Sequence, residues 1–275
     1  MVATGELFLT LATYNMRKAV GLDRRRDPLR ILKVLEEVGA DIIALQEADR
    51  RTGGRASAVP HELWEGHSQW RPVPLGVRNR RALDRLPKVG ARVDDWLNVD
   101  TRNIGWHGNA ILVRPDVGVL DVQALELPTL EPRGAVLAEL LVNDRPIRVV
   151  GLHLDLSGLW RRRQLKAISE AVAVRPQKMP TVLMGDTNEW RANAACLRDL
   201  EPRYAIVAPG PSFHARRPLA VLDRLFVDRS LRVEQAGVHD SELARTASDH
   251  LPVWARIGWP NTIVLPQAET PGHLR

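Results

Sequence analysis

The chain lacks several features that identify whole classes of protein. Its 275 residues include one cysteine, Cys196, which excludes an internal disulfide and a zinc site built from cysteines. No apolar run approaches the roughly 20 residues of a membrane-spanning helix. The opening stretch MVATGELFLTLATYN has no basic segment followed by an apolar one, so a secretion signal is not expected. These absences predict a soluble, cytoplasmic protein in a reducing compartment.

Aromatic residues and lysine are also scarce, whereas arginine is abundant. Aromatic side chains make up 5% of the chain, the net charge is +6 and the isoelectric point is about 10.1. Arginines gather at Arg24–Arg26, Arg161–Arg163 and Arg216–Arg217. Such charge attracts phosphate-bearing ligands. An arginine-favouring composition explains it equally well, so both interpretations stay open.

The pattern of apolar residues predicts many strands and two helices. A chain of 275 residues with 44% hydrophobic content can bury the core of one large domain or two small ones. One helix has Asp27 as its N-cap, Pro28 in its first position and Gly39 at its end, and the other covers residues 159–174. The predicted strands are 7–15, 41–47, 108–113, 135–142, 147–154, 181–186, 221–227 and 250–257. So many strands with so few helices favour a layered α/β fold with mixed or antiparallel sheets.

Two segments have no clear periodicity. Residues 48–107 are rich in arginine, proline, glycine and tryptophan, which is typical of long functional loops. The tryptophans of this segment are Trp64, Trp70, Trp96 and Trp106. They could stack on bases or insert into lipid, but burial of their rings as anchors of the loop is the preferred interpretation. Residues 260–275 are expected to form a poorly ordered tail.

Polar side chains lie at the ends of most of the predicted strands. They are Asn15, Glu47, His153, Asp186, Asn188, Asp223, Asp249 and His250. Because antiparallel neighbours place the start of one strand beside the end of another, we expect one edge to hold them all. Carboxylate and amide oxygens suit a hard cation such as Mg²⁺, and the histidines then remain for proton transfer. GDTN at 185–188 is also an ordinary turn sequence, so its interpretation depends on the other residues.

The order of these residues resembles the endonuclease/exonuclease/phosphatase superfamily. TYN, LQE, GLHL, GDTN, LDRLFV and SDH occur in the family's order, each in a matching strand context. GNAILV, RxxQ at Arg161–Gln164 and PSF at Pro211–Phe213 also look like family features. Each triplet alone is a weak signal, but the ordered series along nearly the whole chain is specific.

The resemblance implies both a fold and a cofactor. The implied fold is α/β, a four-layer sandwich of two packed mixed β-sheets flanked by helices. It would form a single catalytic domain over residues 1–259. The implied cofactor is Mg²⁺, with Mn²⁺ as a substitute. Glu47 would be the principal metal ligand, with Asn15 and Asp249 nearby.

The resemblance also implies a catalytic role for each remaining strand-end residue. Asp186 would orient or deprotonate the attacking water, and Asn188 would hold the phosphate. His250, oriented by Asp223, would contact the scissile phosphate. His153 stands where family members carry a residue that stabilises charge on the phosphate.

Two further residues are candidates for substrate binding. Abasic-site endonucleases of the family carry an acid two positions after the first-motif asparagine, where this chain has Arg17. A cation there weakens the case for a second metal, and it could contact a substrate phosphate instead. Asn109 precedes a strand, and for it a structural role is nearly as strong an interpretation as substrate contact.

These observations predict a Mg²⁺-dependent phosphodiesterase that uses in-line attack by water, with a nuclease as the first choice. The alternative is a hydrolase of phospholipid or sphingolipid head groups or of inositol phosphates. A rival of another class is a non-catalytic nucleic-acid-binding protein on the same fold. The presence of Glu47, Asp186, Asp249 and His250 argues against that rival. We expect a monomer without a transmembrane segment, whose partner is a phosphate-containing substrate such as nucleic acid.

Overall fold

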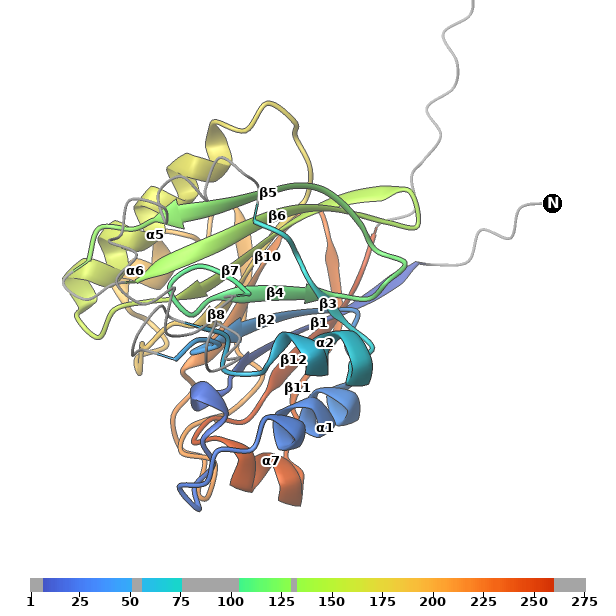
Figure 1. Cartoon of the computed structure of the whole chain (residues 1–275). Coiled ribbons are helices and arrows are strands. Elements are labelled where there is room, and N and C mark those ends of the chain that lie inside the picture. Colours follow the sequence, from blue (N-terminus) through green and yellow to red (C-terminus); the bar gives the residue numbers. More distant parts are fainter. Residues whose placement is uncertain (1–6, 51–55, 76–103, 130–132, 260–275) are drawn as a thin grey trace, which may run out of the picture.

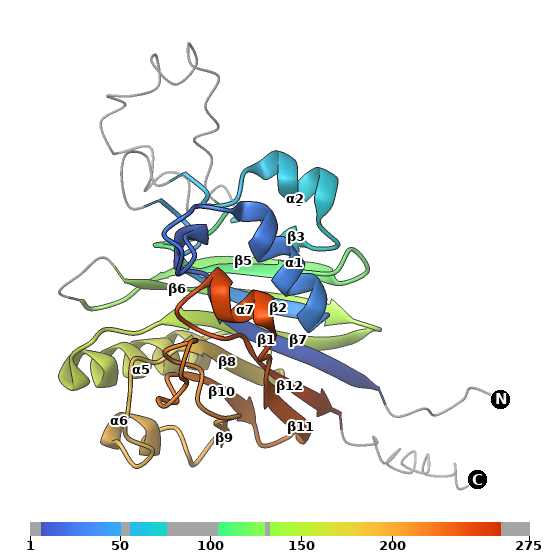
Figure 2. The same ribbon diagram turned by 90° about the horizontal axis from the view of Figure 1, so that it is seen from below.

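The computed structural model describes residues 7–50, 56–75, 104–129 and 133–259. Within these residues the chain forms two mixed six-stranded sheets, packed face to face (Figure 1 and Figure 2). In spatial order the first sheet consists of β11 (Arg232–Val238), β12 (Val253–Gly258), β1 (Phe8–Asn15), β2 (Ile42–Gln46), β4 (Ala110–Val113) and β3 (Arg71–Pro72). The second sheet consists of β5 (Gly118–Glu126), β6 (Gly134–Val142), β7 (Arg145–His153), β8 (Thr181–Asp186), β10 (Asp223–Asp228) and β9 (Tyr204–Val207).

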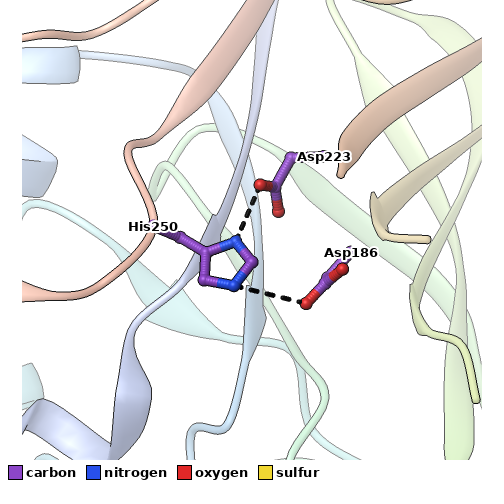
Figure 3. Close-up of side chains that lie close together, drawn as sticks. All are labelled: Asp186, Asp223 and His250. Carbon is purple, nitrogen blue, oxygen red and sulfur yellow. Dashed lines mark hydrogen bonds and ion pairs between the residues drawn. The ribbon is translucent and has the colours of Figure 1, made fainter. Parts of the chain in front are cut away.

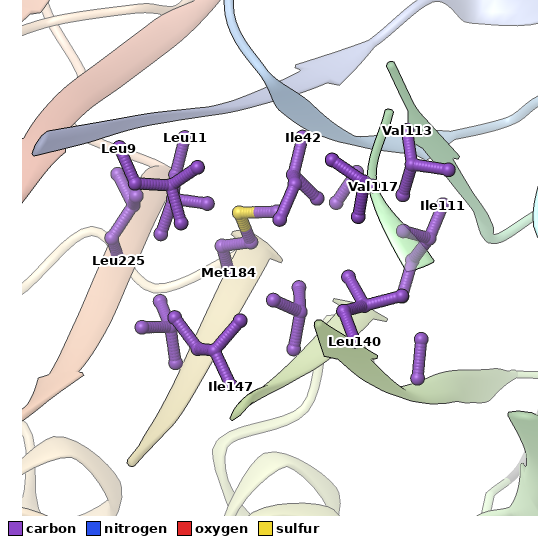
Figure 4. Close-up of a cluster of buried hydrophobic side chains, with 14 of the residues drawn as sticks. Leu9, Leu11, Ile42, Ile111, Val113, Val117, Leu140, Ile147, Met184 and Leu225 are labelled. Atoms are coloured by element: carbon purple, nitrogen blue, oxygen red, sulfur yellow. The ribbon is translucent and has the colours of Figure 1, made fainter. Parts of the chain in front are cut away.

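Each sheet contains one parallel pair of strands, and its other neighbouring strands run antiparallel. The parallel pairs are β1 with β2 and β7 with β8. Aliphatic side chains on the inner faces of both sheets form a single core between them, to which Leu11, Ile42, Leu140 and Met184 belong (Figure 4). Burial of these side chains holds the two sheets together.

Helices cover the outer faces of both sheets, which confirms the predicted four-layer sandwich (Figure 2). The helices over the first sheet are α1 (Pro28–Val38), α2 (His61–His67) and α7 (Glu242–Ala247). Those over the second sheet are α5 (Gly158–Ala173) and α6 (Ala195–Arg198), and a short 3₁₀ turn, η1 (Arg17–Ala19), follows β1. None of the helices in the described ranges is long and apolar enough to cross a bilayer.

The helix α1 forms where its capping residues predict it. The side chain of Asp27 accepts a hydrogen bond from the backbone N of Arg30 at 3.0 Å, and Pro28 occupies the first helical position. Gly39 ends the helix with a φ of 63°, a left-handed conformation that glycine adopts without strain. The helix crosses between β1 and β2, so both strands run in the same direction and end at the same edge.

The elements that the sequence did not reveal lie mostly at sheet edges or in short helices. The strands β3, β5, β9 and β11 form the four edges, and β5 and β11 expose much of their length to solvent. The strand predicted over residues 250–257 begins at Val253, so Asp249 and His250 lie in the preceding loop. The buried rings of Trp64, Trp70 and Trp106 agree with the preferred interpretation of that segment. Trp96 and the predicted tail at 260–275 lie outside the described residues.

Gly185, the first residue of GDTN, lies in β8 opposite Leu152 of β7. A Cβ at this position would lie 1.8 Å from the backbone oxygen of Leu152, which is fixed in the parallel pair. Gly185→Ala should therefore lower the free energy of unfolding by about 3 kcal/mol, the upper part of the usual range for overpacked sites. Gly66→Ala in α2 is the control, because a Cβ there meets nothing within 4 Å. Equal melting temperatures of the two variants would contradict this account of the packing.

Candidate active site

The parallel pairs place four of the predicted residues at one edge of the sandwich. In the first sheet Asn15 ends β1 and pairs with Gln46, the residue before Glu47. In the second sheet His153 ends β7 and pairs with Asp186 at the end of β8. Asn15 Nδ2 donates a hydrogen bond to Asp186 Oδ2 across the two sheets at 3.1 Å. The carboxyl ends of both parallel pairs therefore meet at a single site.

Antiparallel neighbours bring the beginnings of two further segments to this site. β10 starts at Asp223, which pairs with Asp186. β12 runs antiparallel to β1 and starts opposite Thr13, so the loop before it carries Asp249 and His250 to the end of β1. His250 Nδ1 lies 2.8 Å from Asp223 Oδ2. The structure thus brings strand starts and strand ends together at one edge.

Asp186 lies at the centre of this group and is almost completely buried. Its Oδ2 lies 3.4 Å from His153 Nε2 and 3.7 Å from His250 Nε2, in addition to its bond with Asn15. Its Oδ1 accepts a hydrogen bond from the backbone N of Asn188 at 2.9 Å. One carboxylate oxygen therefore faces two imidazoles and an amide, an arrangement that can orient and deprotonate a water molecule.

His250 is buried between two carboxylates (Figure 3). Asp223 Oδ2 also accepts a hydrogen bond from Ser212 Oγ at 2.5 Å, and the ring centroid of Phe213 lies 4.9 Å from that of the imidazole. Burial alone would lower the pKa of His250, but the charges of Asp223 and Asp186 raise it, and the resulting pKa is about 10. His250 is therefore an imidazolium at neutral pH, which suits it to hold an anionic oxygen.

Glu47 and Asp249 each lie beside a cation of the turn η1. Lys18 Nζ lies 2.5 Å from Glu47 Oε2, and Arg17 Nε lies 3.4 Å from Asp249 Oδ2. The backbone φ angles of Arg17, Lys18 and Glu47 are 45°, 58° and 51°. Such left-handed conformations cost non-glycine residues roughly 1–3 kcal/mol each and are common at functional sites, where the surrounding structure holds them in place.

Two groups of side chains could hold a divalent cation. Among the described residues, the ligand atoms of Asp186, Asp223 and His250 all lie within 4.8 Å of one another. The carboxylates of this group already accept hydrogen bonds from the protein, and one of its donors is a nitrogen, which suits Mg²⁺ poorly. The side chains of Glu47 and Asp249 are 17% and 25% exposed, and each already faces a positive charge. Their donors are all oxygens, which suits Mg²⁺ better than a nitrogen does, and Glu47 and Asp249 stay the predicted ligands.

Sequence reasoning missed Arg133, which comes directly before β6. Its Nη1 lies 2.7 Å from Nε2 and 2.9 Å from Nδ1 of His153, and its side chain is buried. The guanidinium places a permanent positive charge beside the strand-end histidine. The sequence offers only an arginine before Gly134, and its importance becomes visible once β6 and β7 are paired, with Ala135 opposite Leu152.

Two of the three predicted asparagines, Asn188 and Asn109, have structural hydrogen bonds of their own. Asn188 Nδ2 donates to the backbone oxygen of Leu154 at 2.8 Å, and because an amide carries two hydrogens, one remains for a ligand. Asn109 is fully buried, and its Nδ2 donates to the backbone oxygen of Gly134 at 2.8 Å. Asn109 therefore connects β4 to β6 across the two sheets. This hydrogen bonding favours a structural role for Asn109 over substrate contact, and its contact with substrate stays a prediction.

Two buried arginines form hydrogen bonds with the segments that follow β7 and β8. Arg161 of α5 donates hydrogen bonds to Glu189 Oε2 at 2.6 Å and to the backbone oxygen of Leu156 at 2.5 Å. Arg224 Nη1 donates to the backbone oxygen of Glu189 at 2.8 Å. Arg161 therefore belongs to the interior, and the interpretation of the whole Arg161–Arg163 cluster as surface charge is wrong for this residue.

The sequence matches the Endonuclease/Exonuclease/phosphatase family over residues 12–250. The chain belongs to this family. Its relatives include the uncharacterized protein YbhP of Escherichia coli K12, which is 29% identical over 162 residues. The match covers 56% of this chain and 63% of YbhP, so the chain spans less than two thirds of the length of that relative.

Solved structures of the family share the fold. An endonuclease/exonuclease/phosphatase from Bacteroides vulgatus aligns with a TM-score of 0.68 at 16% identity, over 93% of this chain and 100% of that one. TDP2 of D. rerio, complexed with a single-strand DNA product, aligns with 0.65 at 15% identity over 91% and 98%. A mannosyl-6-phosphatase of Bacteroides thetaiotaomicron aligns with 0.65 at 18% identity over 90% and 99%. The predicted family and fold are therefore confirmed. The names of these structures point to different substrates, so the comparison does not identify the substrate of this chain.

Proposed function

We propose that this chain is a Mg²⁺-dependent phosphodiesterase that cleaves a P–O bond of nucleic acid by attack of water. The observation that carries the proposal is one buried oxygen of Asp186, which lies within 3.7 Å of nitrogen atoms of Asn15, His153 and His250. Water attack on an anionic phosphorus centre needs a base and positively charged or hydrogen-bonding groups in one place. Membership of a family of phosphoesterases supports P–O hydrolysis as the reaction class.

Each side chain has a task in this reaction. Asp186 orients a water molecule and takes its proton as the water oxygen bonds to phosphorus. His250, protonated and held by Asp223, donates a hydrogen bond to a non-bridging phosphate oxygen. His153, with the charge of Arg133 beside it, stabilises the negative charge as the leaving oxygen departs with the electron pair of the P–O bond and takes up a proton from solvent. The products are a phosphomonoester and an alcohol, with no covalent enzyme intermediate.

Glu47 would hold the metal, with Asn15 and Asp249 as neighbouring oxygen donors. The bound cation would supply positive charge that neutralises the phosphate oxygens, which otherwise repel the attacking water. Lys18 pairs with Glu47 and Arg17 pairs with Asp249 in this structure, so a cation that binds these carboxylates would displace the two positive side chains. Arg17 itself lies at the same rim, where it can contact a phosphate of the substrate.

The charge near the site favours nucleic acid as the substrate. The net charge is +6, and Arg191, Arg216 and Arg217 are exposed in loops next to the site residues. The loop with Arg216 and Arg217 is joined to the site through Ala215, whose backbone N donates to the backbone oxygen of Asp249 at 2.8 Å. A polyanion that covers such a surface releases condensed counterions, which contributes to its affinity.

A panel of phosphoesters tests the choice of substrate. Plasmid DNA, single-stranded DNA, RNA, sphingomyelin, inositol phosphates and a sugar 6-phosphate are each incubated with the protein and Mg²⁺. We expect a nucleic acid to be cleaved fastest. Hydrolysis of the lipid or of the sugar phosphate alone would reject the nuclease assignment while leaving the phosphoesterase mechanism in place.

Glu47→Gln should weaken Mg²⁺ binding while the fold survives, because the change removes one charge and almost no volume. Isothermal titration calorimetry with Mg²⁺ measures the effect, and loss of a ligand charge should reduce the affinity by at least about tenfold, or roughly 1.4 kcal/mol. Glu65→Gln on the exposed side of α2 is the matched control and should leave the affinity unchanged. An affinity of Glu47→Gln equal to that of the control would reject Glu47 as the ligand.

A further inference from the structure

An exposed tryptophan lies directly beside the proposed catalytic centre. Trp190 follows Asn188 by two positions, and its side chain is 65% exposed. Among the exposed large apolar side chains of the described residues, it is the only aromatic one. A single exposed apolar residue is ordinary on a protein surface, so its meaning depends on how it is held and what surrounds it.

The backbone that carries Trp190 is fixed by one buried ion pair and several hydrogen bonds. The preceding residue, Glu189, is bonded through its side chain to Arg161 at 2.6 Å and through its backbone oxygen to Arg224 at 2.8 Å. The backbone N of Arg191 donates to Glu189 Oε1 at 3.0 Å. The indole is therefore presented from a rigid segment, which lowers the entropy lost when a ligand stacks on it.

The indole is also connected to the catalytic histidine through ring contacts. Trp190 meets Phe213 edge to face, with ring centroids 6.1 Å apart and an interplanar angle of 84°. Phe213 in turn lies 4.9 Å from the ring of His250. The edge-to-face contact uses one part of the indole and leaves most of its surface open to solvent. A planar group attached to the scissile phosphate, which His250 holds, would lie within reach of this surface.

Arginines accompany this tryptophan. Arg191 is its neighbour in the chain, and Arg216 and Arg217 are exposed in the loop that starts at Phe213. A surface that inserts into lipid gathers several apolar side chains on one face, whereas here the three exposed arginines outnumber the exposed Leu219 of the same loop. An aromatic ring with cations around it is instead the pattern of sites that stack single-stranded nucleic acid bases and hold their phosphates. The chemistry around Trp190 therefore favours a nucleobase over a lipid chain.

We propose that Trp190 is a stacking platform for an unpaired nucleobase next to the scissile phosphate, with Phe213 as the residue that orients its ring. The proposal rests on the proposed nuclease function and narrows its substrate to nucleic acid with single-stranded character at the cleavage point. It also assigns Trp190 a role in binding, so its replacement raises KM more than it lowers kcat.

The test compares binding of a fluorescein-labelled dT12 oligonucleotide with binding of an abasic oligonucleotide of the same length and charge. Fluorescence anisotropy in buffer with EDTA reads binding without turnover. Trp190→Ala should weaken dT12 binding by about 5- to 150-fold, the range for loss of one base–aromatic stack. Its affinity for the abasic strand should not change. Trp259→Ala, at the opposite end of the sheets, is the matched control and should bind dT12 as the wild type does.

Three results would overturn the proposal. The first is equal dT12 affinity of Trp190→Ala and the wild type, and the second is a wild type that binds dT12 no better than the abasic strand. The third is that Trp190→Ala loses affinity for phosphatidylcholine vesicles but not for dT12, which would assign the indole to a lipid surface. Hydrolysis of bis-p-nitrophenyl phosphate by the wild type with Mg²⁺ is measured in parallel. If one of the three results occurs and the wild type still hydrolyses this compound, only the stacking role of Trp190 is rejected. If the wild type does not hydrolyse it, the proposed function fails as well.

Discussion

Asp186→Asn should slow turnover by about 10²–10⁴-fold, the usual value of general-base catalysis, with little change in melting temperature. The amide keeps the size of the carboxylate, and its single oxygen can still accept one of the two hydrogen bonds that Asn15 and the backbone N of Asn188 donate to separate oxygens of Asp186. It cannot take a proton from water. The loss corresponds to roughly 3–5 kcal/mol in the activation barrier. Single-turnover kinetics on a cleavable phosphodiester measures it directly.

The same variant separates the two interpretations of GDTN. If this stretch were only a turn, asparagine would serve as well as aspartate, because both residues favour turns and caps. Asp116→Asn on the exposed surface is the matched control and should retain the wild-type rate. A rate for Asp186→Asn within about threefold of that control, far less than a missing base would cost, would reduce GDTN to a turn.

His250→Gln should lower kcat by about 10²–10³-fold, because it removes a charged donor to the phosphate. It should also change how stability depends on pH. The pKa of His250 is about 10 in the folded protein against 6.5 as its ordinary value. The resulting stabilisation is fully present below pH 6.5 and is lost as the pH rises from there through about 10, because above that pH the imidazole is deprotonated in both the folded and the unfolded chain. Thermal melts between pH 6 and 10 measure this loss in the wild type.

In His250→Gln this part of the pH dependence should disappear. His239→Gln is the control, because the side chain of His239 pairs with Glu37 at 2.8 Å and not with a carboxylate of the site. A wild type and a His250→Gln variant whose melting temperatures fall in parallel over this range would show that Asp223 and Asp186 do not hold the imidazolium. An unchanged kcat would remove His250 from the catalytic group.

The sequence was sufficient to predict the layers and the edge at which the site forms. The central strands are continuous apolar runs that end in polar residues, and such runs can be recognised in the sequence alone. Examples are LQE at the end of β2 and GLHL at the end of β7. The capping residues Asp27 and Gly39 likewise determine where α1 begins and ends. Edge strands such as β11 alternate less regularly, because one side has no neighbour and much of the strand is exposed.

The parts of the site that could not be predicted depend on side chains that meet only after folding. Arg133 reaches His153 from the position just before a neighbouring strand, and Lys18 reaches Glu47 through a left-handed turn that no common sequence signal predicts. The tryptophans show the same difficulty in another way. Trp64 and Trp70 stand in a tryptophan-rich segment but are buried, whereas Trp190, which stands alone after GDTN, is exposed beside the site. Spacing along the chain does not distinguish these cases.

The central claim is hydrolysis of a phosphodiester that depends on a divalent metal and on Asp186. It is tested most directly with bis-p-nitrophenyl phosphate and protein stripped of metal by EDTA, assayed before and after addition of Mg²⁺. The Asp186→Asn variant, purified in the same way, serves as the blank for contaminating phosphoesterases. The account predicts no turnover in EDTA, restored turnover with Mg²⁺, and a rate in the variant lower by about 10²–10⁴-fold. Full turnover in EDTA, or equal turnover by the wild type and the variant, would contradict it.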